Sequence, residues 1–288
     1  MAELPSHLAA ALDRVVSAED VVTAAPAAAL WATFGRAGTP PGAGEALPPL
    51  WHGLYCTAKL APDRLAADGL AKDETLLPAV PELPQRLFAG ARFTFHRPLR
   101  IGEAVRKDSR IARFEAKEGR SGRLLFAHVE HRVSGPAGLC IVEENDIVYR
   151  GAAGGTGGGA AAGTVATTEP SEAAWRATID PDPVLLFRHS AVTFNSHRVH
   201  YDRRYVEQHG MPGLLVQGTL IARLMLELVN REQPDARVAR FSFRSGRPLY
   251  DTAPFTLAGQ PAADGGAAQL WAIDAKGGAA MTAEVGFG

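Results

Sequence analysis

Residues 187–230 read FRHSAVTFNSHRVHYDRRYVEQHGMPGLLVQGTLIARLMLELVN, and this stretch decides the predicted fold. Its last part begins at Gly218 and places apolar side chains around most of a helix. The pattern is broken only by Thr219, Arg223, Glu227 and Asn230. Their spacing of four, four and three predicts one narrow polar stripe, on which Arg223 and Glu227 can pair across a turn. Because such a helix has to be buried on nearly every side, we expect a curved sheet to wrap around it.

Strand patterns lie on both sides of this helix. Before it we expect strands at residues 91–96, 105–114, 123–133 and 139–150, joined by Gly-containing turns into an antiparallel meander. Residues 175–179, which also precede the helix, are expected to form a strand or a short turn, and after the helix we expect strands at residues 238–244, 255–259, 269–274 and 281–285. Residues 14–35 are expected to be helical, with Ser17 to Asp20 read as a capping box.

Residues 151–163 contain only Gly, Ala and one Thr, a composition typical of a flexible linker. The segment also fits the pattern G-x-G-x-x-A, but no apolar helix follows it, so a dinucleotide site is not favoured. We therefore predict an N-terminal half at 1–150, a linker at 151–168 and a C-terminal half at 169–288. The C-terminal half contains the polar turn at 195–202 and is expected to carry the chemistry, whereas the N-terminal half lacks such a turn and is expected to be a non-catalytic binding wall. Each half reads as a helical entry followed by a meander, which indicates a tandem α+β fold.

The overall composition excludes several classes of partner. The 288 residues include 30 basic and 31 acidic side chains, so no net field favours nucleic acid or an anionic membrane. The sequence shows no apolar run of membrane-spanning length and no secretory signal. Cys56 and Cys140 are isolated, which argues against a disulfide framework or a thiolate zinc site. We expect a protein of the reducing cytoplasm.

The polar turn from Asn195 to Asp202 is where chemistry is expected. Asp202 precedes a short amphipathic segment, 203–209, and is predicted to cap it. His189, His197 and His200 could together bind a metal, but no Cys, Glu or Asp stands at a recognisable ligand spacing, so no metal is predicted. On its own residues, His200 fits a buried core histidine as well as a catalytic one. Trp51 and His52 are expected to be core residues, and His128 and His131 ordinary sheet residues.

The turn resembles the signature of MaoC-type hydratases, which have the hot-dog fold and carry D-x-N-P-x-H-x-D followed by G-x-x-x-H-G. The corresponding segments here are 195–202 and 213–218. A branch of that family has two hot-dog halves in one chain and includes hydroxyacyl-thioester dehydratases of type 2 and mesaconyl-CoA and itaconyl-CoA hydratases. Further segments resemble that branch: P-P-L-W-H at 48–52, F-H-R-P-L at 95–99 and E-E-N-D-I-V-Y-R at 143–150.

The resemblance implies tandem hot-dog folds, each an antiparallel sheet around a central helix, and reversible hydration of a 2-enoyl-CoA thioester. It implies that His200 transfers the proton, that Asn195 orients water, and that the amide of Gly218 stabilises the oxyanion. The chain departs from the wider family at Asn195, where an Asp is usual, and at Gln217, where a His is usual. His200 therefore has to act alone or with a carboxylate from elsewhere.

The remaining predicted residues and partners follow from the same resemblance. His197, Arg198 and Gln217 are the expected substrate-binding residues, and coenzyme A enters only as part of the substrate, without another cofactor. The expected substrate is a branched C5 dicarboxylic thioester, mesaconyl-CoA or itaconyl-CoA, giving citramalyl-CoA. The alternatives are a straight-chain 3-hydroxyacyl thioester, thioester hydrolysis, and acyl-CoA binding without turnover. Hot-dog sheets usually associate edge to edge, which the two halves can do within one chain; a homodimer of chains is expected but not required.

Overall fold

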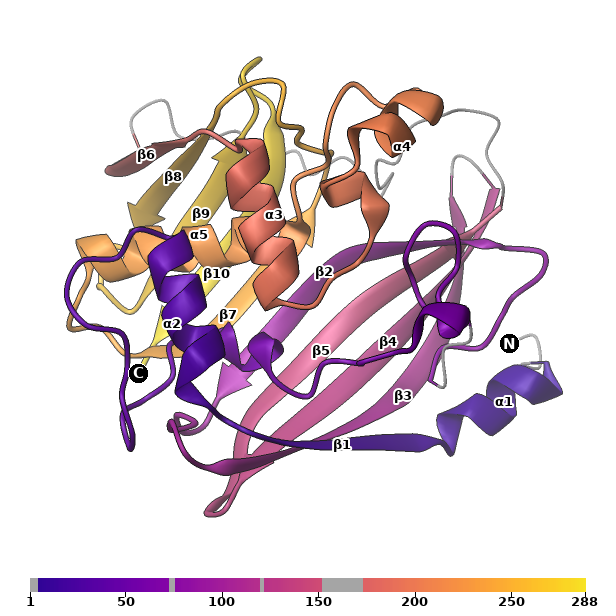
Figure 1. The fold of residues 1–288 in the computed structure, drawn as a ribbon, viewed down its shortest axis with the longest axis horizontal. Coiled ribbons are helices and arrows are strands. Elements are labelled where there is room, and N and C mark those ends of the chain that lie inside the picture. Colours follow the sequence, from indigo (N-terminus) through magenta and orange to yellow (C-terminus); the bar gives the residue numbers. More distant parts are fainter. Residues whose placement is uncertain (1–4, 73–75, 120–121, 152–172) are drawn as a thin grey trace.

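The computed structural model describes residues 5–72, 76–119, 122–151 and 173–288. Its ten strands form one antiparallel sheet in the order β1-β3-β4-β5-β2-β7-β10-β9-β8-β6 (Figure 1). The first five strands are β1 (Val15–Val21), β2 (Gln85–Phe95), β3 (Ala104–Gly119), β4 (Gly122–Gly135) and β5 (Gly138–Arg150). The other five are β6 (Trp175–Ile179), β7 (Val238–Ser245), β8 (Phe255–Pro261), β9 (Ala267–Ile273) and β10 (Ala279–Phe287).

The described helices are short except for one. The α-helices are α1 (Ser6–Leu12), α2 (Ala24–Thr33), α3 (Pro183–Val192), α4 (Arg203–Gln208) and α5 (Gly218–Glu232). The 3-10 helices are η1 (Trp51–Leu54), η2 (Pro62–Arg64) and η3 (Arg198–His200). No helix in the described ranges is long and apolar enough to cross a membrane.

The sheet is built from the same strand order twice. If β1 to β5 are matched in turn with β6 to β10, the order reads the same from either edge. The centre is the antiparallel pair β2 and β7, where Phe93 lies opposite Phe241 with ring centroids 6.2 Å apart. Their burial, with that of Phe243, joins the two sets of strands through one apolar core.

Helix α5 is the element that the second set of strands wraps, as predicted. It contacts β6, β8 and β9, and Figure 1 shows it lying along the C-terminal strands. Apolar residues from Leu220 to Val229 are buried around its circumference, with Leu220 and Met225 fully enclosed. Each such side chain contributes roughly 1.5–3 kcal/mol on burial.

The first set of strands has no comparable helix among its described residues. Between α2 and β2, where α5 would correspond in chain order, the described residues form only η1 and η2. Helix α1 covers a different face, where Leu8 and Ala11 join Ile111 and Leu125 in a separate apolar cluster. The space beside η1 therefore lies between the two halves of the sheet, and the cavities described below occupy it.

The prediction of a helix at 14–35 is wrong for its first part. Residues Val15–Val21 form the edge strand β1, paired with β3, and the helix begins only at Ala24. Ser17 does not cap a helix, because its hydroxyl donates to Asp108 at 2.5 Å across the strand pair. The valines at both ends of this segment favour a strand over a helix.

The other predicted strands are confirmed and are longer than expected in most cases. Helix α3 was not predicted; it begins after Asp182, whose carboxylate accepts from Val184 N at 2.6 Å and Leu185 N at 3.1 Å. The predicted linker, 151–168, lies outside the described residues apart from Gly151.

Candidate active site

The polar turn leaves α3 and passes through η3 into α4. Phe194 adopts a left-handed backbone conformation, with φ at 53°, which turns the chain sharply away from α3. Asp202 then accepts a hydrogen bond from Tyr205 N at 3.1 Å and caps α4, as predicted. Asn195 stays on the turn, where its side-chain oxygen accepts from His197 N at 3.1 Å.

A loop from the N-terminal half holds this turn in place. Ser196 Oγ donates to Gly69 O at 2.6 Å, and Arg198 N donates to Asp68 O at 2.8 Å. Gly69 has φ of +87°, and a Cβ there would lie only 1.9 Å from the carbonyl oxygen of Ser196. Only glycine fits this approach, so the turn depends on both halves of the chain.

The His200 imidazole is oriented by the segment that leads into α5. Nδ1 lies 2.7 Å from Leu215 O, to which it donates, so the lone pair of the neutral ring is on Nε2. Nε2 makes no hydrogen bond to any described residue. Burial lowers the pKa of His200 to about 4, and the nearby His197 ring, 5.4 Å away, acts in the same direction. The ring is therefore a neutral base at pH 7.

The amide end of α5 lies just beyond Leu215. Gln217 precedes the helix without a side-chain cap, and neither Gly218 N nor Thr219 N donates to another described residue. Free amides at a helix start are donors for a developing oxyanion. A Cβ at Gly218 would lie 3.7 Å from Met281 Cε, so the protein interior itself does not demand glycine there.

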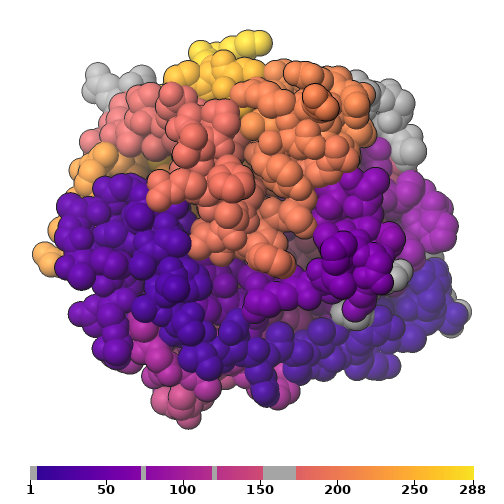
Figure 2. Space-filling view, in the orientation of Figure 1, coloured from indigo at the N-terminus to yellow at the C-terminus, as the bar shows by residue number. Residues whose placement is uncertain are grey.

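A cavity of about 260 Å³ opens beside this helix end. Asn195 and Thr219 line it, together with residues from η1, β2 and β5 of the N-terminal half. His200 does not line this cavity; its link to the helix end is the Leu215 carbonyl. Figure 2 shows the surface hollowed where the chain near residue 200 meets the purple N-terminal segment. The structure thus brings Asn195 and Thr219, in the first turn of α5, to one cavity, whereas Gly218 and His200 do not line it.

The same cavity holds a His–Glu pair that the sequence did not reveal as functional. His52 Nε2 lies 3.0 Å from Glu143 Oε2, and Asn145 Nδ2 donates to Glu143 Oε1 at 2.8 Å. Burial alone would raise the pKa of Glu143, but the contact with His52 outweighs it and lowers the pKa to about 2. Position 195, where the wider family has Asp, carries no carboxylate in this chain, but Glu143 on β5 places one in the same cavity.

A signal for His52 was present in the sequence. The wider family has His-Gly where this chain has Gln217-Gly218 at the start of α5, and the N-terminal half carries His52-Gly53 within η1. Trp51 is a core residue as expected, edge-on to Trp31 at 6.5 Å.

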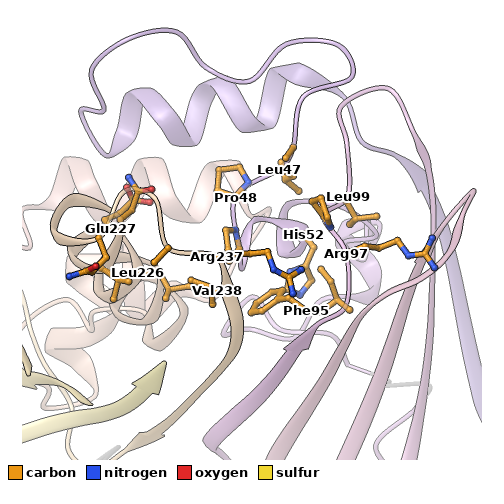
Figure 3. Close-up of a pocket in the computed structure, with 18 of the residues that line it drawn as sticks. Leu47, Pro48, His52, Phe95, Arg97, Leu99, Leu226, Glu227, Arg237 and Val238 are labelled. Atoms are coloured by element: carbon orange, nitrogen blue, oxygen red, sulfur yellow. The ribbon is translucent and has the colours of Figure 1, made fainter. Parts of the chain in front are cut away.

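His52 also lines a second cavity, of about 340 Å³, on the C-terminal side of α5 (Figure 3). Its wall is largely apolar and includes Phe95, Leu226 and Val238. His52 therefore stands between the two cavities. Both cavities run along the polar stripe of α5, with Thr219 at the first and Glu227 at the second.

The predicted pairing of Arg223 with Glu227 is wrong. Glu227 binds Arg36 instead, with Nε to Oε2 at 2.5 Å and Nη2 to Oε1 at 2.9 Å. Arg223 donates to Leu50 O and to the ring of His189. The polar stripe of α5 faces the N-terminal half. Arg36 and Leu50 of that half therefore bind Glu227 and Arg223, in place of a pair within the helix.

The predicted substrate-binding residues have protein partners. Arg198 contacts Asp202 through Nε at 3.0 Å and Nη2 at 2.8 Å. Gln217 is buried, and its amide donates to Leu186 O at 3.0 Å and Ser190 Oγ at 2.9 Å. His197 is half-buried beside His200. These contacts hold the turn, α3 and α5 together, while direct contact with substrate stays a prediction.

Comparison with known proteins identifies the family. Residues 50–251 match the family model for hydroxyacyl-thioester dehydratase type 2. The chain belongs to this family. It is also 41% identical over 278 residues to a mesaconyl-C(4)-CoA hydratase of Chloroflexus aurantiacus, covering 96% of each chain.

Solved structures show the same fold at lower identity. HtdX of Mycobacterium tuberculosis is 20% identical with a TM-score of 0.62, over 94% of this chain and 99% of that one. A second protein of that organism, described as having a double hotdog fold, is 16% identical with a TM-score of 0.54 over 95% of both chains. The predicted tandem hot-dog fold is confirmed, although within the described residues only the second set of strands wraps a central helix. This member of the dehydratase family is a hydro-lyase.

Proposed function

We propose that the chain hydrates the double bond of a branched C5 dicarboxylic 2-enoyl-CoA, converting mesaconyl-C(4)-CoA to citramalyl-CoA. The relative with 41% identity over nearly the whole chain supports this substrate class. The observation that carries the chemistry is the placement of His200. Its Nδ1 is held by Leu215 O at 2.7 Å, three residues before the amide end of α5.

The proposed reaction uses the residues in distinct roles. His200 Nε2 takes a proton from a water molecule that Asn195 orients, and the water oxygen bonds to the β-carbon. As the carbon–carbon double bond opens, negative charge collects on the thioester oxygen, where Gly218 N and Thr219 N donate hydrogen bonds. The imidazolium then returns its proton to the α-carbon. Water is added in full, and the histidine ends neutral as it began.

A turnover screen tests this proposal. Enoyl-CoA substrates of four to eight carbons, with and without a second carboxylate, are offered to the purified protein, and loss of the enoyl-thioester absorbance is followed. The proposal requires the fastest hydration with mesaconyl-C(4)-CoA. Release of free thiol would identify thioester hydrolysis, and tight binding without turnover would identify a binding protein; either result overturns it.

Dehydration of straight-chain 3-hydroxyacyl thioesters is the second candidate. The family's description names hydroxyacyl-thioester dehydration, and the largely apolar cavity of about 340 Å³ beside His52 offers room for a longer acyl chain. Activity that rises from four to eight carbons without a second carboxylate would favour this candidate. Itaconyl-CoA remains the other dicarboxylic candidate.

We also propose that the protein is a homodimer located in the cytoplasm. Strands β1 and β6 are the two edges of the sheet, and edge pairing there would give the homodimer proposed here. Light scattering on the purified protein tests this. Cys56 and Cys140 are free buried thiols, which supports the proposed cytoplasmic location, and no cofactor besides the substrate's coenzyme A enters the reaction.

A further inference from the structure

The guanidinium of Arg223 is buried between the two halves without a carboxylate at contact distance. Its residue is only 5% exposed. Nε and Nη2 donate to Leu50 O at 3.3 and 3.2 Å, and Nη1 donates to His189 Nε2 at 2.8 Å. No carboxylate of the described residues lies within 4.0 Å of its nitrogens. A carbonyl and a neutral ring are its whole set of protein partners.

This arrangement is costly unless a ligand completes it. A buried charge without a carboxylate in contact loses several kcal/mol of hydration, which a carbonyl, an imidazole and the more distant charge of Glu143 restore only in part. Burial lowers the pKa of Arg223 to about 10, so the side chain is still charged at neutral pH. A permanently charged group in this environment favours the binding of an anion.

Arg223 also has donors to spare and faces a cavity. A guanidinium has five N–H groups, and the contacts above use three of them. Arg223 lines the 260 Å³ cavity together with Asn195 and Thr219. Glu143 lines it too, but its two oxygens are engaged by His52 and Asn145. The unused donors of Arg223 therefore remain for a ligand in this cavity.

The spacing along α5 fits a short dicarboxylic acyl group. Thr219 and Arg223 are four residues apart, which is about 6 Å along the helix axis. Side chains tilt towards the start of a helix, so the guanidinium leans back towards the amide end. A thioester oxygen at the amides of Gly218 and Thr219 would leave the substituents of the β-carbon within reach of Arg223.

We propose that Arg223 binds the carboxylate carried by the β-carbon of the acyl group and so selects dicarboxylic over monocarboxylic thioesters. This inference rests on the proposed function and names the residue responsible for its substrate class. Asn195 and Thr219 complete the polar wall around that carboxylate.

Arg223 also ties η1 and α3 to α5, so loss of activity alone would not separate recognition from structure. Binding of two saturated probes does separate them. Succinyl-CoA carries a carboxylate on its β-carbon, and butyryl-CoA carries a methyl group there. Neither has a double bond, so calorimetry measures their dissociation constants without turnover. The proteins compared are the wild type, Arg223→Met, Arg223→Lys and Arg97→Met, the last removing an arginine that lines the other cavity.

The expected result is selective. Arg223→Met weakens succinyl-CoA binding by about 10- to 100-fold, the usual loss for a hydrogen bond to a charged group, and changes butyryl-CoA binding less than about 3-fold. Arg223→Lys keeps the charge, so its dissociation constant for succinyl-CoA lies between those of the wild type and Arg223→Met. Arg97→Met binds both probes as the wild type does. The inference is overturned if Arg223→Lys and Arg223→Met each weaken the binding of both probes equally, or if neither variant changes the binding of either probe.

The same proteins separate this inference from the proposed function. If the wild type fails to hydrate mesaconyl-C(4)-CoA, the proposed substrate is wrong. Selective loss of succinyl-CoA binding in Arg223→Met would still support the role of Arg223. If the wild type does hydrate mesaconyl-C(4)-CoA but Arg223→Met binds succinyl-CoA as tightly as the wild type does, the inference alone fails.

Discussion

Activity should persist at a pH where an ordinary histidine base has failed. Burial lowers the pKa of His200 from 6.5 to about 4. At pH 5.5 a histidine with a pKa of 6.5 is about 90% protonated, whereas one with a pKa of about 4 is about 3% protonated. We predict that kcat/KM at pH 5.5 stays within about 10% of its value at pH 7.5 and falls only as the pH approaches 4.

The same shift affects stability. The folded pKa lies below the unfolded value, so the unfolded chain binds the proton first. The stability that the neutral ring contributes is fully present above pH 6.5 and is lost as the pH falls towards 4, by about 3 kcal/mol. The lowered pKa of Glu143 affects stability at lower pH. The stability that its charged form contributes is present above pH 4.5 and is lost as the pH falls towards about 2. Urea unfolding from pH 7.5 to 4 measures the loss.

The activity assay uses short mixing times, so that rates are read before acid unfolding begins. Loss of enoyl-thioester absorbance is followed after a rapid jump from pH 7.5 to each test pH. An acid limb in kcat/KM with an apparent pKa between 6 and 7 would contradict the reasoning. It would mean that the proton-transfer group is a solvated histidine and not the buried ring of His200.

Three further predictions follow from contacts around the site. Gly69→Ala should lower the free energy of unfolding by about 1–3 kcal/mol and reduce turnover at least tenfold, because the alanine Cβ would lie 1.9 Å from the carbonyl oxygen of Ser196. Gly38→Ala is the control, because Gly38 has a similar φ and a Cβ there would meet nothing within 4 Å. Gly218→Ala should leave the unfolding free energy unchanged or raise it by about 0.4–1 kcal/mol while kcat/KM falls at least tenfold, and unchanged turnover would show that the thioester does not approach this backbone. Glu227→Gln should lower stability by about 1–3 kcal/mol, and a double-mutant cycle with Arg36→Gln in urea unfolding should show coupling between the two residues; purely additive losses would contradict it.

Local periodicity was enough to predict the strands and the central helix. From Gly218 to Asn230 most residues are apolar, and such a helix is stable only when it is buried on nearly every side. The strands after it alternate and are separated by Gly-containing turns, so their number followed from the sequence. The cap at Asp202 was predictable for the same reason, since it acts only on its neighbours.

What the sequence could not show was set by partners distant in the chain. Val15–Val21 is a strand because it pairs with β3, although residues Ser17 to Asp20 resemble a helix cap. Glu143 and His52 are 91 residues apart, so only the fold reveals their contact. Glu227 likewise pairs with Arg36 across the two halves and not with its helical neighbour.

The central claim is that the His200 imidazole performs the proton transfer in enoyl-thioester hydration. The most direct measurement compares kcat/KM for mesaconyl-C(4)-CoA between His200→Gln and the matched control His209→Gln. The His209 ring is exposed just after α4 and stacks on Tyr205 with ring centroids 4.1 Å apart. The account predicts a fall of about 10²- to 10⁴-fold for His200→Gln and wild-type rates for His209→Gln. Equal hydration by the two folded variants would contradict it.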